Sequence, residues 1–175
     1  KIIKKENKQS KILDIGCSGG ELINELNLKG FKHVVGIDIS ETAIKKCKLR
    51  GLKNCLLMDA SKAKLNQKFD LIIASDVLEH IEDDYGCINL WKNMLNQNGK
   101  IICFVPAFRI LWSHHDVSNK HFRRYSKKVL SNIFISNGLK IERTSFWNFF
   151  LFFPALLTRV FLKLFGISKN QLKHS

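Results

Sequence analysis

The sequence lacks three features that would narrow its function class directly. None of its five cysteines stands in a C-x-x-C spacing, and no signal peptide is visible. Isolated cysteines predict buried thiols in a reducing compartment, so we expect a cytoplasmic protein. Acidic residues are scarce: 15 Asp and Glu stand against 29 Lys and Arg, a net charge of +14. This charge suits nucleic acid or an anionic membrane surface, or reflects only a lysine-rich composition.

Length and composition predict a single domain. The chain has 175 residues, 45% of them apolar and 25% charged, which are ordinary proportions for a soluble globular protein with a real core. It begins at Lys1 rather than Met, so we expect that part of the N-terminus is missing.

The stretch 11–22, KILDIGCSGGEL, predicts a ligand-binding corner. A short apolar run ends in small residues, and a helical pattern begins at Glu21. A strand, a tight turn and a helix N-terminus form the nucleotide-binding corner of doubly wound α/β domains. Gly16 and Gly20 would let the backbone approach a ligand without interference from Cβ atoms.

The corner lacks the dinucleotide fingerprint, because Ser18 and Glu21 stand where glycine or alanine is required. Asp14 lies just before the turn, so carboxylates flank the loop on both sides and would repel a pyrophosphate. They suit a ligand that carries an amino group and a cationic centre. S-adenosylmethionine is such a ligand.

Several motifs then resemble one family. Residues 13–20, LDIGCSGG, resemble motif I of the class I methyltransferases, D-x-G-x-G-x-G, with Ser18 in place of the middle glycine. Residues 69–81, FDLIIASDVLEHI, and 95–102, LNQNGKII, resemble later segments of small-molecule and lipid-directed members, the methyltransferase type 11/12 group. The resemblance implies an α/β fold: a Rossmann-like three-layer α/β/α sandwich with a mostly parallel central sheet. It also implies an S-adenosyl-L-methionine-dependent methyltransferase (EC 2.1.1.-).

Residues near the carboxyl ends of the expected strands form the predicted cofactor site. Asp38 follows a strand at 33–37, about 20 residues beyond the glycine turn, where such folds bind ribose hydroxyls. The resemblance places Asp59 at the adenine amino group, and Cys17 is expected to be a small turn residue rather than a nucleophile. The residues expected at the cofactor are Asp14, Gly16, Cys17, Ser18, Gly20, Asp38, Ile39, Asp59, Ala60 and Ser75.

Further strands are expected at 54–58, 68–74, 100–105 and 139–145, with Asn98-Gly99 as a turn. Ser40 and Ser126 are expected to cap helices at 41–50 and 127–136, and a third helix is expected at 83–96. The family ends its sheet with an antiparallel seventh strand between the fifth and sixth. No strand pattern follows Phe165, so we expect a fragment that lacks this strand.

Residues 106–125 are predicted to form an insertion that caps the substrate. It contains W-S-H-H-D and H-F-R-R-Y, whose paired arginines, histidine and tyrosine suit an anionic headgroup. The pattern resembles uncharacterised methyltransferases linked to cell-envelope or lipid-linked sugar chemistry. No metal is expected, because the spacing matches no compact zinc pattern; a solvated basic surface is the alternative. The candidate substrate residues are Asp116, His121, Arg123, Arg124 and Tyr125.

A hydroxyl acceptor would need a base to take its proton. His80 and His115 are the candidates, because histidine titrates near neutral pH. A helix cap or a supporting position is the alternative role for His80.

Residues 146–175 are predicted to be a separate hydrophobic, amphipathic and truncated C-terminal segment after a methyltransferase domain at 1–145. Its run of Phe and Leu is long enough to suggest a membrane span, but Asn148, Pro154, Arg159 and Lys163 argue against one. We expect it to lie in an anionic membrane interface, at the cytoplasmic face. Packing on the protein's own sheet or on a second subunit is the alternative.

The sequence thus predicts methyl transfer to O, N or C of a small-molecule, lipid or lipid-linked acceptor. An RNA or protein methyltransferase is favoured only by the charge, and no N/D-P-P-[FY] signature follows the fourth strand. A non-catalytic, membrane-associated cofactor-binding module is the alternative from another class. The oligomeric state is left open.

Overall fold

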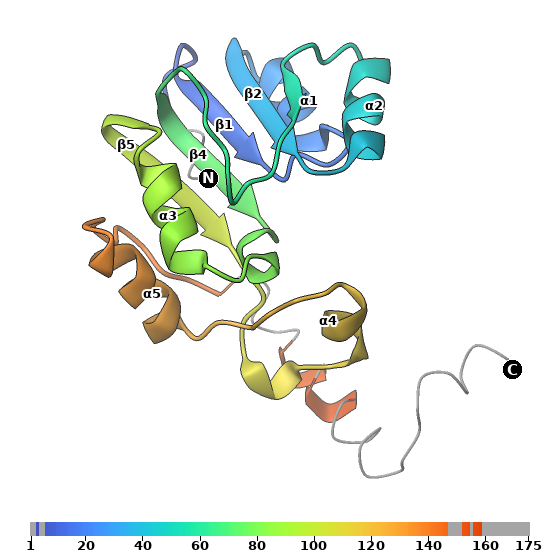
Figure 1. Cartoon of the computed structure of the whole chain (residues 1–175), viewed down its shortest axis with the longest axis vertical. Helices are drawn as coiled ribbons and strands as arrows, with labels where there is room; N and C mark the ends of the chain where they lie inside the picture. The colour runs from blue at the N-terminus through green and yellow to red at the C-terminus, as the bar shows by residue number, and fades with distance from the viewer. Residues whose placement is uncertain (1–2, 4–5, 147–151, 155, 159–175) are drawn as a thin grey trace, which may run out of the picture.

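A parallel sheet forms the centre of the computed structural model, which describes residues 3, 6–146, 152–154 and 156–158. Its strands follow the order β3-β2-β1-β4-β5, and every ladder is parallel (Figure 1). The strands are β1 (Lys11–Ile15), β2 (His33–Asp38), β3 (Cys55–Leu57), β4 (Phe69–Ser75) and β5 (Leu95–Phe104). This order reverses direction at β1, so the carboxyl ends of β1 and β4 open a crevice for a ligand.

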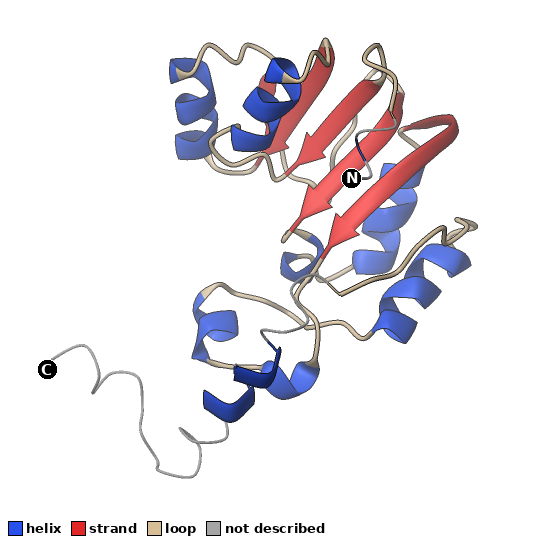
Figure 2. Cartoon of the chain, turned by 180° about the vertical axis from the view of Figure 1, so that it is seen from behind, coloured by secondary structure: helices blue, strands red, loops and turns tan. Residues whose placement is uncertain are grey.

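Helices cover both faces of the sheet (Figures 1 and 2). The main helices are α1 (Glu21–Leu28), α2 (Glu41–Leu49), α3 (Asp84–Lys92) and α5 (Lys127–Ser136). Ser40 and Ser126 cap α2 and α5 as expected: their hydroxyls accept from the N–H groups of Ala43 and Val129, both at 3.2 Å. The expected three-layer sandwich is therefore confirmed.

Alternation along the strands divides the core into two clusters. On β1, Ile12 packs in the cluster with residues of α1 and α2, whereas Leu13 and Ile15 pack in the cluster with residues of α3 and α5. All three side chains are fully buried. Burial of each such side chain stabilises the fold by about 1.5–3 kcal/mol, so this strand anchors both layers.

The expected sixth strand at 139–145 does not form, and the sheet described here ends at β5. The family's sixth strand pairs with the seventh strand, and no such strand is present among the described residues. Segment 139–145 therefore has no partner for its backbone groups in the sheet.

The strand β5 starts earlier than expected. It pairs Leu95 with Phe69 and Lys100 with Leu71, so the register shifts between the two pairs. Asn98, with φ +64°, lies in this irregular stretch. Asn98-Gly99 therefore bends a strand instead of preceding one.

The 106–125 insertion lies beyond the carboxyl end of β5 (Figure 1). It contains a 3₁₀ turn at Arg109–Leu111 and the short helix α4 (His114–Ser118). The helical residues 152–154 and 156–158 lie next to this insertion and away from the sheet in both views (Figures 1 and 2). Most of the expected amphipathic segment 146–165 is outside the described residues. Within the described residues, none of the helices is long and apolar enough to cross a membrane.

Candidate functional site

The loop between β1 and α1 folds back on the end of β2. Gly16, Ser18 and Gly20 all have positive φ, at +73°, +48° and +82°. The N–H groups of Gly16 and Cys17 both donate to the Ile37 carbonyl, at 2.8 and 3.0 Å. These bonds hold the loop against the crevice.

The loop depends on glycine at positions 16 and 20 for internal packing as well as for a positive φ. A Cβ at Gly16 would lie 2.4 Å from Cγ2 of Val77, and one at Gly20 would lie 2.3 Å from Cδ1 of Leu52. We expected glycine here so that the backbone could approach a ligand. That expectation stays a prediction, and the structure adds that the missing Cβ atoms would face neighbouring protein side chains.

Asp38 connects the loop to the following helix. Its carboxylate accepts hydrogen bonds from the N–H of Ser18 and the N–H of Ser40, both at 2.8 Å. These backbone donors fix the carboxylate at the end of β2 and leave lone pairs for ribose hydroxyls. Ile39, next to it, is 73% exposed and thus free to cover a ligand.

Asp14 supplies a second, buried carboxylate. It is only 3% exposed, and among the described residues no hydrogen bond or ion pair holds its side chain. Burial, and then the nearby Asp38 carboxylate, raise the pKa of Asp14 to about 7. A cationic ligand in the crevice would relieve this repulsion, so the pair fits the amino group and sulfonium of S-adenosylmethionine.

The end of β3 leads into a turn fixed by Asp59, whose Oδ1 accepts from the N–H of Ser61 at 2.8 Å and from its hydroxyl at 2.7 Å. The Ala60 carbonyl accepts from the indole N–H of Trp91 at 3.0 Å. This anchor from α3 was not predicted from the sequence. Ser75 is the last residue of β4, at the same edge of the sheet.

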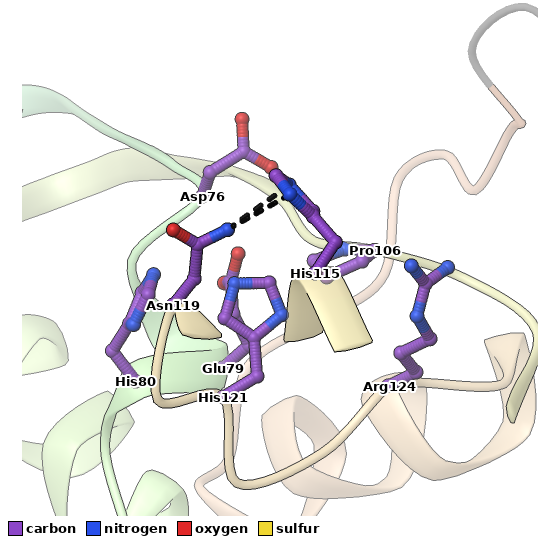
Figure 3. A pocket seen from close by; sticks show the side chains of 8 residues that line it. All are labelled: Asp76, Glu79, His80, Pro106, His115, Asn119, His121 and Arg124. Atoms are coloured by element: carbon purple, nitrogen blue, oxygen red, sulfur yellow. Dashed lines mark hydrogen bonds between the residues drawn. The ribbon is translucent and has the colours of Figure 1, made fainter. Parts of the chain in front are cut away.

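A cavity of about 410 Å³ adjoins this edge (Figure 3). It lies between the residues that follow β4 and the 106–125 insertion, and its volume suits a small molecule. The lining residues are Asp76, Glu79, His80, Pro106, His115, Asn119, His121 and Arg124.

Glu79 is the main residue that the sequence reasoning missed. Its side chain is fully buried, and neither carboxylate oxygen has a hydrogen-bond partner. Burial is the largest of the causes that raise its pKa to about 7. The sequence signal was available, because Glu79 is the acid of the E-H pair in the segment 69–81.

The candidate bases lie on two sides of the cavity. His80 contacts His121 edge to face, with ring centroids 4.6 Å apart. Burial, and then His121, lower the pKa of His80, so it is neutral at pH 7. His115 lies on α4, with its Nε2 3.0 Å from the Asn119 amide nitrogen (Figure 3).

Asp116 organises the insertion. Its fully buried carboxylate accepts from Nε of Arg124 at 2.6 Å and lies 3.1 Å from Nδ1 of His121. It also accepts from the Ser113 N–H at 2.8 Å, which makes Ser113 and Asp116 the capping box of α4. Burial alone would raise the pKa of Asp116, but the hydrogen bonds from Arg124 and Ser113 outweigh burial and hold it below its usual range.

The other expected substrate residues make internal contacts. Arg123 pairs with Asp84 at 2.7 Å, and the Tyr125 hydroxyl donates to the same carboxylate at 2.9 Å. Tyr125 is buried and is not among the residues that line the cavity. Of the expected substrate residues, His121 and Arg124 therefore line the cavity. Asp116, Arg123 and Tyr125 lie behind its wall and bond to other residues of the protein.

The cavity also contains a possible set of metal ligands, which the sequence spacing did not suggest. Glu79, His80 and His121 each offer one ligand atom, and these atoms lie within 4.8 Å of one another. Carboxylate and imidazole ligands suit several divalent cations.

Comparison with known proteins agrees with this geometry. The model of the family described as "Methyltransferase domain" matches residues 6–132. The chain therefore belongs to this family, whose class I members depend on S-adenosylmethionine.

Curated relatives include two ubiquinone biosynthesis O-methyltransferases. The protein of Bartonella tribocorum is 35% identical over 108 residues, 58% of this chain and 42% of that protein. The protein of Chromobacterium violaceum is 24% identical over 136 residues, 74% of this chain and 53% of that protein. The chain thus spans about half the length of the curated relatives it matches.

Solved structures share the fold. Magnesium protoporphyrin IX methyltransferase from Synechocystis PCC 6803, with bound SAH, has a TM-score of 0.66 at 22% identity. The match covers 82% of this chain and 71% of that chain. A methyltransferase from Mesorhizobium loti has a TM-score of 0.67 at 20% identity, with coverages of 77% and 76%.

Proposed function

We propose that this chain transfers the methyl group of S-adenosylmethionine to a hydroxyl oxygen of a small-molecule or lipid-linked acceptor. The observation that carries the proposal is the Glu79 carboxylate, buried and without a partner in a cavity at the cofactor edge of the sheet. The O-methyltransferase names of the curated relatives support an oxygen acceptor.

When bound, the cofactor supplies a methyl group on a positively charged sulfur. Transfer of this methyl group to a hydroxyl oxygen would release the hydroxyl proton, which a group of the chain must accept. The chain's main contributions are proximity, orientation and acceptance of this proton. The predicted set of residues would hold the cofactor: Asp14 would offset its positive charge and Asp38 would accept hydrogen bonds from the ribose hydroxyls.

Glu79 and His80 are the groups best placed to take the proton. A carboxyl whose pKa is raised to about 7 gains and loses a proton near neutral pH, and an imidazole whose pKa is lowered is unprotonated there and able to accept one. His121, oriented by Asp116, supports His80 across the cavity. His115 is the alternative base on the opposite wall.

Transfer of a labelled methyl group to a panel of catechols and prenylated phenols tests this proposal. Glu79→Gln keeps the shape of the side chain but cannot accept the proton, and we expect kcat to fall by about 100-fold or more. S-adenosylhomocysteine binding should remain within about twofold. Glu82→Gln, at an exposed position three residues away, is the matched control and should leave kcat unchanged.

Two results would contradict the proposal. An active wild-type enzyme with an equally active Glu79→Gln variant would exclude Glu79 as the base. A folded chain that binds no S-adenosylhomocysteine would exclude the methyltransferase activity itself and favour a structural role.

A second proposal concerns peripheral membrane contact. Large apolar side chains are exposed on the insertion that borders the cavity: Ile110 is 69% exposed, Val117 60% and Phe122 51%. Phe108 of the same insertion stacks on Phe146, with ring centroids 4.7 Å apart, so the C-terminal segment starts beside this surface. We infer that this side of the molecule faces an anionic bilayer.

Flotation with vesicles tests this contact. We expect binding to vesicles that contain anionic lipid, weakened several-fold in the variant Ile110→Ser/Phe122→Ser. The control variant Leu28→Ser/Leu49→Ser changes two exposed leucines on the far helices α1 and α2 and should bind normally. Equal binding by all three proteins would exclude this surface.

A further inference from the structure

Three cysteines meet beneath the cofactor loop. Cys17 lies in the loop after β1, Cys47 on α2 and Cys55 at the start of β3. All three are free thiols and buried, and their Sγ atoms lie within 4.8 Å of one another. Far apart in sequence, they form a separate group from the acceptor cavity.

The group contacts the loop directly. The Cys47 thiol donates to the Ser18 carbonyl at 3.2 Å, and the N–H of Ser18 donates to the Asp38 carboxylate. The Cys47 thiol is therefore bonded to the same residue, Ser18, whose N–H holds the Asp38 carboxylate.

The surroundings favour a cation over bare thiolates. Burial raises the pKa of Cys17, the other two thiols raise it further, and the carboxylates of Asp14 and Asp38 add to the effect. Burial likewise raises the pKa of Cys55 to about 12. Burial and the nearby carboxylates therefore disfavour three bare thiolates more strongly than three thiolates that share one bound cation.

A surface cavity of about 290 Å³ reaches one member of the group. Cys55 lines it together with Leu52, and Lys32 and Lys53 stand at the same wall. Two ammonium groups favour an ion that arrives as an anionic complex rather than as a free cation.

We propose that Cys17, Cys47 and Cys55 bind one thiophilic cation of the Cu(I) class, and that this ion weakens cofactor binding to the loop above. Soft thiolates select Cu(I), and the group offers three sulfurs, whereas structural zinc sites take four protein ligands. With metal–sulfur bonds of about 2.3 Å, trigonal coordination places sulfurs about 4 Å apart, within the separation found here. The effect on the cofactor rests on the proposed function; the metal site does not.

The binding step is a ligand exchange without change of oxidation state. Cu(I) leaves a complex with three small-molecule thiolates, such as those of three glutathione molecules, and bonds to the three cysteine sulfurs. Each cysteine proton passes to a departing thiolate. Cys47 then has no proton to donate to the Ser18 carbonyl, and two electronegative atoms face each other there, which disfavours the loop conformation that binds the cofactor.

Anaerobic transfer of Cu(I) from its glutathione complex to the full chain, followed by gel filtration and metal analysis, tests the site. We expect one ion per chain, and at least tenfold less transfer to Cys55→Ala and Cys47→Ala. Cys103→Ala, which removes a thiol of β5 outside the group, is the matched control. Thermal melts of each variant identify any loss that is due to unfolding, and Cys55→Ser gives a second, more conservative test of the same ligand.

Calorimetric titration with S-adenosylhomocysteine, with and without the ion, tests the regulatory part. We expect affinity to fall at least fivefold in the wild type and to stay unchanged in Cys55→Ala. No uptake by the wild type, or equal uptake by every variant, would overturn the metal site. Uptake with no change in affinity would overturn the regulation, and a chain that binds metal but never the cofactor would count against the proposed function alone.

Discussion

The carboxylate of Asp38 accepts the backbone N–H of Ser18 at 2.8 Å, so the end of β2 is joined to the tip of the cofactor loop. Its other oxygen accepts the Ser40 N–H at 2.8 Å, one residue before α2 begins. Three segments of the crevice are thus held by one side chain.

Asp38→Asn should weaken S-adenosylhomocysteine binding by about 10- to 100-fold in calorimetric titration. The two N–H groups bond to different carboxylate oxygens, and the amide offers only one, so one hydrogen bond is lost and the other loses its charge. Each charge-assisted bond contributes about 1.5–3 kcal/mol. Asp70→Asn is the matched control, since Asp70 accepts the Lys11 N–H at the opposite edge of the sheet. Equal losses in the two variants would indicate general destabilisation instead.

Gly16→Ala should destabilise the fold by about 2 kcal/mol or more, because the new Cβ would lie 2.4 Å from Cγ2 of Val77 at a φ of +73°. Urea unfolding measures the change. The double variant Gly16→Ala/Val77→Ala removes the clash but keeps the unfavourable φ, so we expect partial recovery relative to Val77→Ala alone. An additive loss in the double variant would show that the contact with Val77 does not matter.

The sequence predicted the β1–α1 corner well because its signals are local. Apolar alternation, small turn residues and an acid at the end of β2 lie within 28 residues, and the structure places them together. The caps Ser40 and Ser126 were predictable for the same reason.

The acceptor cavity was less predictable because it depends on contacts between distant segments. Glu79 is buried where the insertion packs over it, with the Phe122 N–H donating to the Glu79 carbonyl at 2.8 Å. Arg124 was predicted to bind an anionic headgroup, and the structure pairs its guanidinium with the Asp116 carboxylate. The S-x-x-D capping box at Ser113 could have indicated this helix, whereas the pairing of Asp116 with Arg124 could not be read from the sequence.

Asp116→Asn should destabilise the protein by about 3 kcal/mol, since it leaves the Arg124 guanidinium partly buried without a charged partner. We also expect faster limited proteolysis within 106–125, where the carboxylate joins α4 to the following segment. Glu25→Gln is the control, because its pair with Lys29 is exposed and such pairs contribute less than about 1 kcal/mol. A change below this value for Asp116→Asn would show that the network does not hold the insertion.

Glu79→Gln should make the protein more stable at pH 8 while leaving its stability at pH 4.5 nearly unchanged. The folded-state pKa of Glu79 is raised to about 7, above its ordinary value, so the folded state holds a proton that the unfolded chain releases. The unfolding free energy of the wild type therefore declines between about pH 4.5 and 7, and the glutamine variant lacks this contribution. We expect a difference on the order of 3 kcal/mol at pH 8.

Urea unfolding at several pH values measures this difference, with Glu82→Gln as the exposed control. Asp14 also has a raised pKa, but it is present in both proteins and cancels in the comparison.

The methyl transfer rate should show the opposite trend: it should rise as the pH passes about 7, because only the ionised carboxylate accepts the acceptor's proton. If Glu79→Gln is more stable at pH 8 yet inactive, the Glu79 carboxylate takes the acceptor's proton and lowers the stability of the fold. Equal pH dependence in wild type and variant would place the Glu79 carboxyl in contact with solvent or a partner and remove the basis for its role.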